Sequence, residues 1–226
     1  MEIKPIAYIR TEFAEKFGIP RQSGLAEGLR GQIVFEPEFR NREALRGLEG
    51  FSHLWLIWEF SANRGGRQWQ PTVRPPRLGG NQHMGVFATR SPFRPNPLGL
   101  SCVELESVDP DSPDGPIIVV KGADLMDGTP IYDIKPYIKY ADSHPDAVCG
   151  YADQLSDRRI NVMLSDELAA KIPDAQALIE VLSLDPRPSY HDDPQREYGM
   201  TFSGYNVKFK VAEGPGGPEA VVLEIS

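Results

Sequence analysis

The amino-acid sequence predicts a mainly β fold, in which a closed or nearly closed β-barrel is followed by a small unit of helices and strands. Short apolar or alternating segments bounded by Gly, Pro or Asp dominate the first 140 residues, a pattern typical of β-strands. Only one short helical segment stands among them, so the chain cannot build the repeated strand-helix-strand units of a doubly wound sheet. Closure into a barrel is favoured because it removes exposed sheet edges.

The strands expected in this part of the chain are each apolar or alternate between apolar and polar residues. They are residues 3–10, 31–35, 51–60, 85–89, 98–108, 117–121 and 131–138. Residues 41–48 are expected to form a short helix.

The composition changes after Tyr140, where residues 141–157 are polar and irregular and indicate a connection between domains. We therefore expect a first domain over residues 1–140 and a second, smaller one over residues 141–226.

In the second domain, residues 165–184 are expected to be helical, with Ser165 as an N-cap and Pro173 beginning a second helix. Residues 201–211 and 219–225 are expected to be strands joined by a turn-rich segment. The unit has few apolar residues for its size, so it should pack on the barrel or on a partner subunit.

The length of 226 residues suffices for a hydrophobic core without disulfides. The two cysteines, Cys102 and Cys149, have neither metal-binding nor redox spacing. The N-terminus lacks the apolar stretch of a signal peptide, and the longest apolar-rich run, residues 51–60, is too short to cross a bilayer. We therefore expect a soluble, cytoplasmic protein.

The net charge of -8 argues against a nucleic-acid partner, but the charge is unevenly distributed. Between Phe60 and Val103 there are six arginines, no lysine and no acidic residue. A guanidinium can bind phosphate through two donors and can stack on bases, whereas an ammonium is a point charge. The segment therefore suits RNA contact, and the alternative is a solvated loop.

Residues 85–100, GVFATRSPFRPNPLGL, hold the most informative motif. Three prolines between residues 92 and 97 restrict the backbone, so Arg90, Arg94 and Asn96 are presented with little conformational freedom. The pattern predicts a preorganised binding site. The alternative is that Arg90 merely ties the turn together through nearby carbonyl groups.

A second motif, DLMDGTPIYDIKPY, spans residues 124–137. Asp127 and Gly128 are expected to form a tight turn between two strands, whose backbone could bind a flat heterocycle. Asp133 and Lys135 alternate along one face of a strand and could form a surface ion pair or a pair of site groups.

Two loops complete the candidate sites. Residues 68–80 combine Pro, Arg and Gly in a segment suited to a shaped loop, with an ordinary surface excursion as the alternative. In DPRPSY, residues 185–190, two prolines fix the backbone around Arg187, and Tyr190 could stack on a base.

Several chemistries have no support in the sequence. GxGxxG and GxxxxGK[ST] motifs are absent, as is a GxSxG elbow, and the four histidines have no ligand spacing. A metal site, a phosphate-binding loop and a serine hydrolase are therefore not expected. A hydrolase using Asp133 or Asp185 would have only the carboxylates in its favour.

The motif GVFATRSPFRPNPLGLS resembles the signature of the TsaA/YaeB-like family, whose characterised bacterial members are tRNA adenine-N6 methyltransferases. Further matching segments follow in order, and the resemblance covers nearly the whole chain. They are KFGIPRQSGL at 16–25, RGLEGFSHLWLI at 46–57, PTVRPPRLGG at 71–80, DGTPIYDIKPY at 127–137 and DPRPSY at 185–190.

The resemblance implies a single-sheet β-barrel of the class VIII methyltransferase type with a small α+β C-terminal domain, a homodimer, and S-adenosylmethionine as methyl donor. It also implies methylation of N6-threonylcarbamoyladenosine beside the anticodon, typically in threonine tRNA. The donor-site residues it implies are Gln22, Ser23, Gly24, Ser61, Ala62, Arg90, Leu100, Asp124, Leu125, Met126, Asp127 and Gly128.

The N6 atom of N6-threonylcarbamoyladenosine is a ureido nitrogen, less nucleophilic than an amine, so a proton acceptor should assist transfer. We expect Asp133 and Tyr137 in that role. The residues expected to bind the substrate tRNA are Arg74, Arg77, Arg94, Asn96, Lys135, Arg187 and Tyr190. The alternative function is a non-catalytic module that binds S-adenosylmethionine or tRNA.

Overall fold

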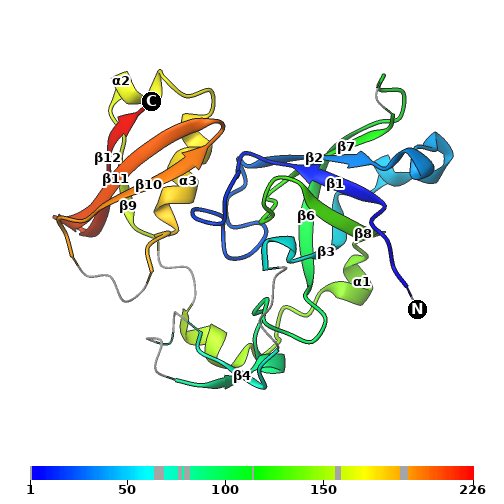
Figure 1. Cartoon of the computed structure of the whole chain (residues 1–226), viewed down its shortest axis with the longest axis horizontal. Coiled ribbons are helices and arrows are strands. Elements are labelled where there is room, and N and C mark those ends of the chain that lie inside the picture. Colours follow the sequence, from blue (N-terminus) through cyan, green and yellow to red (C-terminus); the bar gives the residue numbers. More distant parts are fainter. Residues whose placement is uncertain are drawn as a thin grey trace.

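The computed structural model describes residues 2–63, 69–75, 78, 82–113, 115–155, 159–188 and 193–226. Two hydrophobic cores organise the chain, one inside a β-barrel and one between a smaller sheet and a helix (Figure 1).

Six antiparallel strands form the barrel in the order β1-β2-β7-β6-β3-β8. They are β1 (Ala7–Arg10), β2 (Arg30–Phe35), β3 (His53–Glu59), β6 (Leu98–Asp109), β7 (Ile117–Lys121) and β8 (Thr129–Pro136). Strand β8 pairs with β1, which closes the sheet on itself. The prediction of a closed barrel is confirmed.

Alternating side chains fill the barrel. In β3, Leu54, Leu56 and Trp58 are buried, whereas the residues between them are partly exposed, because successive side chains point to opposite faces of a sheet. Ile9 of β1 and Ile131 of β8 join the same core. The barrel therefore encloses packed side chains, and a ligand has to bind at one of its ends or outside it.

One end of the barrel gathers three connections. Antiparallel pairing places the ends of β1, β3 and β7 beside the beginnings of β2, β6 and β8. The connections that leave from this end are residues 11–29, 60–97 and 122–128. Segments far apart in the sequence therefore meet here.

The strand predicted at residues 85–89 is wrong. Only Met84–Gly85 is extended there (β5), and it pairs with β4 (Thr72–Val73) outside the barrel. A 3-10 turn follows over Val86–Ala88. Phe87 is 74% exposed, so its apolar side chain is not part of a buried strand.

The helix expected over residues 41–48 is a 3-10 turn over Arg42–Leu45, whose N-cap is Asn41. Similar turns over Pro37–Phe39 and Leu48–Gly50 flank it. Further helical elements are α1 (Lys139–Asp142) and 3-10 turns over Ser61–Asn63 and Gly150–Leu155.

The C-terminal unit is a sheet with the order β10-β11-β12-β9, and α3 covers its buried face. Its elements are β9 (Asn161–Met163), α2 (Asp166–Ala169), α3 (Ala175–Ser183), β10 (Glu197–Phe202), β11 (Tyr205–Gly214) and β12 (Gly217–Ile225). Ser165 caps α2 as predicted. Helix α3 begins at Ala175, two residues after the predicted start at Pro173, and its N-cap is Asp174.

The single strand predicted over residues 201–211 is wrong. A turn at Ser203 and Gly204, both with positive φ angles, divides it into the hairpin β10–β11. Strand β9, which the sequence did not indicate, adds a parallel edge of three residues to β12.

The connection between β1 and β2 belongs to the C-terminal core. Phe13, Ala26 and Leu29 are buried with the side chains of the C-terminal sheet and α3. In Figure 1 this segment, in blue, lies between α3 and the barrel. The C-terminal unit therefore completes its core with an N-terminal segment, as its low apolar content led us to expect.

Within the described residues, no helix is both long enough and apolar enough to cross a membrane.

Candidate functional site

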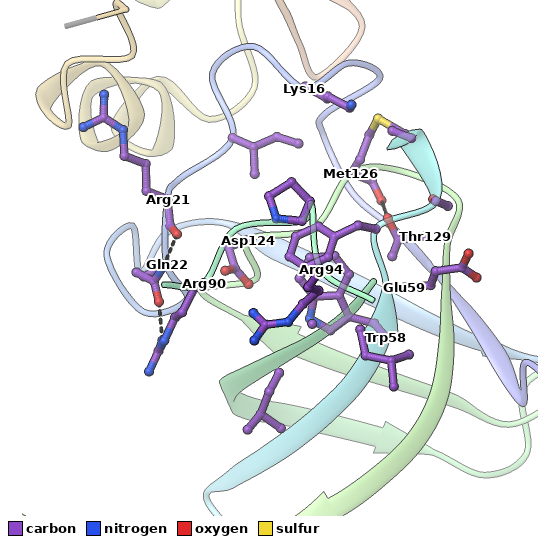
Figure 2. A pocket seen from close by; sticks show the side chains of 18 of the residues that line it. Lys16, Arg21, Gln22, Trp58, Glu59, Arg90, Arg94, Asp124, Met126 and Thr129 are labelled. Carbon is purple, nitrogen blue, oxygen red and sulfur yellow. Dashed lines mark hydrogen bonds between the residues drawn. The ribbon is translucent and has the colours of Figure 1, made fainter. Parts of the chain in front are cut away.

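A cavity of about 700 Å³ lies at the barrel end from which the three connections leave. Its walls come from residues 16–22, 55–62, 90–100 and 124–129 (Figure 2). Each of these segments belongs to one of the three connections or to the adjoining end of β3, β6 or β8, so the antiparallel topology brings them together.

An aromatic pair forms an apolar surface in the cavity. Trp58 lies opposite Gly99 in the pairing of β3 with β6. A Cβ atom at Gly99 would lie 2.3 Å from an indole carbon, so the close approach requires glycine. Phe60 packs edge-on against the indole with 4.4 Å between ring centroids. Such a surface suits a flat heterocycle.

Asp124 places a carboxylate beside this aromatic surface. Its Oδ1 accepts a hydrogen bond from the Ser101 hydroxyl at 2.5 Å, and Ser101 in turn accepts one from Trp58 Nε1 at 3.0 Å. Burial raises the pKa of the Asp124 carboxyl above its ordinary value, although the Ser101 hydrogen bond and the charge of Arg90 oppose that rise. The cavity therefore holds a partly desolvated acid.

Two arginines of the proline-rich turn line the cavity, and each is held in place. Arg90 donates to Oε1 of Gln22, which joins the turn to the β1–β2 connection (Figure 2). Arg94 donates to the carbonyl of Thr89 at 3.2 Å. These hydrogen bonds restrict the freedom of both side chains.

Arg21 joins the cavity wall to the C-terminal unit. It donates to the carbonyls of Asp185 and Arg187 at 3.3 and 3.4 Å. Arg187 forms a two-point ion pair with Asp185, with both N–O distances at 2.8 Å. Asp185 and Arg187 are therefore tied to the wall of the cavity.

A second carboxylate, Glu59, lines the cavity at the end of β3. The hydroxyl of Tyr132 in β8 donates to its Oε2. Because Tyr132 stands on the neighbouring strand, this bond fixes the direction of the Glu59 side chain.

Seven of the twelve residues expected at the donor site and two of the seven expected to bind tRNA meet in this cavity. Those that line it are Gln22, Ser61, Ala62, Arg90, Arg94, Asn96, Leu100, Asp124 and Met126. Leu100 faces outward on β6, whereas Trp58 faces inward on β3, so the cavity extends from the barrel end onto its outer surface.

Other expected donor-site residues support the wall without lining it. The Gly24 amide donates to the Gly122 carbonyl at 2.9 Å, beside Ser23. Asp127 Oδ1 accepts a bond from the Thr11 amide at 3.0 Å. Leu125 is buried in the barrel core, and Gly128 has a φ of +71° in the predicted turn. This turn joins β7 to β8, which are not neighbours in the barrel.

The two residues expected to accept a proton lie away from the cavity. Asp133 forms an ion pair with Lys135 at 3.0 Å on the outer surface of β8, which is the surface alternative left open by the sequence. The Tyr137 ring contacts those of His53 and Trp55, with 6.0 Å between centroids in each case. None of Asp133, Lys135 and Tyr137 lines the cavity.

Among the residues expected to bind tRNA, Arg74 lies outside the cavity and donates through Nε to His83 Nε2 at 2.9 Å. Arg187 is engaged with Asp185. Arg77 and Tyr190 lie outside the described residues.

Sequence reasoning missed several residues that build the cavity or its floor. They are Lys16, Trp58, Glu59, Phe60, Phe93 and Ser101. Trp58, Glu59 and Phe60 directly precede Ser61, an expected donor-site residue, at the end of a predicted strand. This position could have indicated that they lie near the site. Ser101 carried no signal, because its role depends on contacts with residues distant in sequence.

Among the described residues, no group of three or more His, Cys, Asp or Glu side chains could hold a metal ion.

Known proteins resemble this chain over nearly its whole length. The family model described as the tRNA-methyltransferase O N-terminal domain matches residues 8–143, and the model of the TrmO C-terminal domain matches residues 157–226. The chain is 41% identical over 233 residues to the tRNA (adenine(37)-N6)-methyltransferase of Escherichia coli (strain K12), with 99% of this chain and 97% of that protein covered.

The human protein named tRNA (adenine(37)-N6)-methyltransferase is 40% identical over 152 residues, which are 66% of this chain and 33% of the human chain. The crystal structure of TrmO from Pseudomonas aeruginosa has a TM-score of 0.79 and 35% identity, with 100% of this chain and 98% of that chain covered. The resemblance found in the sequence is confirmed, and the chain belongs to the tRNA-methyltransferase O (TrmO) family.

Proposed function

We propose that this protein transfers a methyl group from S-adenosylmethionine to N6 of the adenine at position 37 of a tRNA, beside the anticodon. The cavity carries this proposal, because it gathers motif residues from three connections at one end of the barrel. Relatives named tRNA (adenine(37)-N6)-methyltransferases support the reaction and the base.

The residues of the cavity fit S-adenosylmethionine, which has a flat adenine, a ribose and an amino-acid end with both charges. A volume of about 700 Å³ is within the usual range for a site of this kind. Trp58 and Phe60 offer an apolar surface for a heterocycle, Asp124 a carboxylate for cationic or hydroxyl groups, and Arg90 a cation for a carboxylate. When bound, S-adenosylmethionine supplies a methyl group on a positively charged sulfur.

The protein itself contributes alignment and exclusion of water, which are the main demands of a displacement at carbon. Arg90 and Gln22 hold each other across the mouth of the cavity. Trp58, Phe60 and Phe93 line its apolar part. The hydrogen bond between Arg90 and Gln22 restrains both side chains and so reduces the reorganisation needed on binding.

The accepting nitrogen must lose a proton as it gains the methyl group. Asp133 and Tyr137 were expected to take that proton, but neither lines the cavity. We assign the role to Glu59, whose carboxylate lines the cavity and is oriented by Tyr132. The N6 proton passes to Glu59 as the nitrogen–carbon bond forms.

We propose N6-threonylcarbamoyladenosine, typically in threonine tRNA, as the substrate nucleoside. Arg94 and Asn96 at the cavity are assigned to the nucleotide, and the arginine-rich segment between Phe60 and Val103 to phosphates. Arg74 in this segment is exposed and supports the assignment.

We also propose that residues 1–140 form the donor-binding domain and residues 141–226 the smaller domain, and that the protein is cytoplasmic.

We propose that the protein is a homodimer. Leu98 and Leu100 support the dimer, because they face outward on β6 and are 36% and 57% exposed. Adjacent exposed apolar side chains favour a self-complementary contact. Sedimentation equilibrium tests the assembly.

The deciding experiment is transfer of labelled methyl from S-adenosylmethionine to tRNA with and without the threonylcarbamoyl group, read as nucleosides by mass spectrometry. We expect label on N6 of the modified adenosine only. Label on unmodified adenosine would refute the substrate assignment. Donor binding without transfer to either tRNA would indicate a non-catalytic binding module.

A further inference from the structure

Ser101 is a buried serine whose hydroxyl bonds differently from those of two other buried residues, Thr129 and Ser183. Ser101, Thr129 and Ser183 are 1%, 2% and 9% exposed. Thr129 and Ser183 each donate to a backbone carbonyl three residues earlier, at 2.7 Å. Ser101 donates to the Asp124 carboxylate, which lies on a different segment and lines the cavity. Its hydrogen bond therefore acts on the site and not on its own backbone.

The direction of the Ser101 hydroxyl is fixed from the other side by Trp58. Trp58 Nε1 lies 3.0 Å from Ser101 Oγ, and Trp58 is only 7% exposed. An indole N–H can only donate, so Ser101 accepts that bond and turns its single proton toward Asp124. The chain Trp58–Ser101–Asp124 therefore runs in one direction from the barrel core to the cavity.

We infer that Ser101 is a positioning residue for the donor site, which holds the Asp124 carboxylate at the cavity in the orientation that binds a cationic ligand. The inference rests on the proposed donor site. A carboxylate held by two successive bonds loses little side-chain freedom on binding, and this raises affinity. Ser101 itself need not touch the ligand.

Ser101 also favours the ionised form of Asp124, because a hydrogen bond donated to a carboxylate stabilises its charge. Burial acts in the opposite direction and raises the pKa of Asp124 above its ordinary value. The other charged groups that line the same cavity are Lys16, Arg21, Glu59, Arg90 and Arg94. Binding of the cationic S-adenosylmethionine requires an ionised Asp124 carboxylate. The affinity for S-adenosylmethionine should therefore weaken as the pH falls through the pKa of Asp124.

The test is the dissociation constant of S-adenosylmethionine, measured by calorimetry from mildly acidic to slightly alkaline pH. Ser101→Ala should bind about tenfold more weakly, the loss expected for a hydrogen bond to a charged group. The acid-side midpoint of binding should also move to higher pH, because the ionised Asp124 carboxylate loses a hydrogen bond from Ser101. Ser101→Thr keeps the hydroxyl and should restore the wild-type midpoint.

Matched variants separate positioning from a general loss of packing. Ser183→Ala removes a buried hydroxyl from the C-terminal core and should leave donor binding unchanged. Glu27→Gln removes an exposed carboxylate outside the cavity and should leave the acid-side midpoint in place. Asp124→Asn should abolish the acid-side transition. If Ser101→Ala does not fold, the nearly isosteric Ser101→Cys, a weaker donor, should shift the midpoint in the same direction.

Equal midpoints for wild type and a folded Ser101→Ala or Ser101→Cys protein would overturn the inference. An equal shift in Ser183→Ala would also overturn it, because the effect would then not be specific to the Asp124 contact. Absence of donor binding by the wild-type protein would instead refute the proposed donor site and, with it, this inference.

Discussion

Trp58 and Gly99 occupy opposite positions in β3 and β6. The large indole of Trp58 fits there because Gly99 has no side chain. The indole lies where a side chain at Gly99 would have to be, and it carries the hydrogen bond that begins the chain to Asp124. At the residue scale, the chemistry of the cavity therefore depends on a missing Cβ atom as much as on charged groups.

Gly99→Ala should destabilise the protein by about 1–3 kcal/mol, the usual range for overpacking a core. The new methyl group would meet the indole at 2.3 Å and displace it from Ser101. Urea unfolding measures the stability, and calorimetry the donor affinity, which should fall as well. Gly85→Ala is the matched control, because a Cβ atom there meets nothing within 4 Å. Equal stability of the two variants would contradict the packing argument.

Glu12 is a partly buried acid outside the cavity. Burial raises the pKa of its carboxyl above the ordinary value of 4.5, against the effect of backbone hydrogen bonds. Its Oε2 is buried without a hydrogen-bond partner among the described residues. A raised folded-state pKa means that the protonated form stabilises the fold, fully below pH 4.5 and less as the pH rises through the folded-state value.

Glu12→Gln removes this ionisation and should make the protein more stable than wild type at neutral pH. The difference should shrink as the pH falls and vanish below the ordinary pKa of a glutamate. Urea unfolding of both proteins over a pH series measures it, and the exposed Glu27→Gln serves as the control. A stability difference that grows toward acid pH would contradict a raised pKa of Glu12.

At the scale of elements, an irregularity in β8 decides which side chains reach the site. Trp58 pairs with Ile131, but Ile57 pairs with Asp133, so Tyr132 is an extra residue in β8. One extra residue reverses the alternation of faces along a strand. Asp133 therefore faces outward although Ile131, two residues earlier, is buried in the barrel. Periodicity alone could not have predicted this.

Helix α3 begins two residues after Pro173, the start that the sequence predicted, and its N-cap is Asp174. Asp174 Oδ1 accepts a hydrogen bond from the Ala177 amide at 2.9 Å. Loss of such a cap costs about 1 kcal/mol. Asp174→Ala should lower the free energy of unfolding by that amount, as measured in urea, whereas Asp174→Asn keeps the acceptor and should cost little. Equal losses in both variants would assign the effect to charge and not to capping.

At the scale of the whole molecule, residues 11–29 join the two cores. Phe13 is fully buried and packs edge-on against Phe202 of β10, with 5.7 Å between ring centroids. The same connection supplies Gln22 to the cavity. The C-terminal unit therefore shapes the cavity through a segment that belongs to the N-terminal half of the sequence.

Phe13→Ala should destabilise the C-terminal unit by about 3–5 kcal/mol, as for other large-to-small changes of buried phenylalanine. Hydrogen exchange of the β10 and β11 amides measures the effect directly, because these strands lie far from Phe13 in the sequence. The exposed Phe87→Ala is the matched control. Unchanged protection of β10 in Phe13→Ala would show that the two cores are independent.

The sequence by itself determined the six barrel strands and the motif segments that indicate the family, because alternation and turn residues are local properties. It also predicted a strand over residues 85–89 that the structure does not have. It also led to Gln22, Arg90, Arg94 and Asp124, which the fold brings to one cavity. Only the tertiary structure decided that Asp133 and Lys135 pair on the outer surface. The same holds for Ser101, whose partners lie 43 and 23 residues away in the sequence. Such contacts depend on strand register and on a single extra residue in β8, and a local pattern specifies neither.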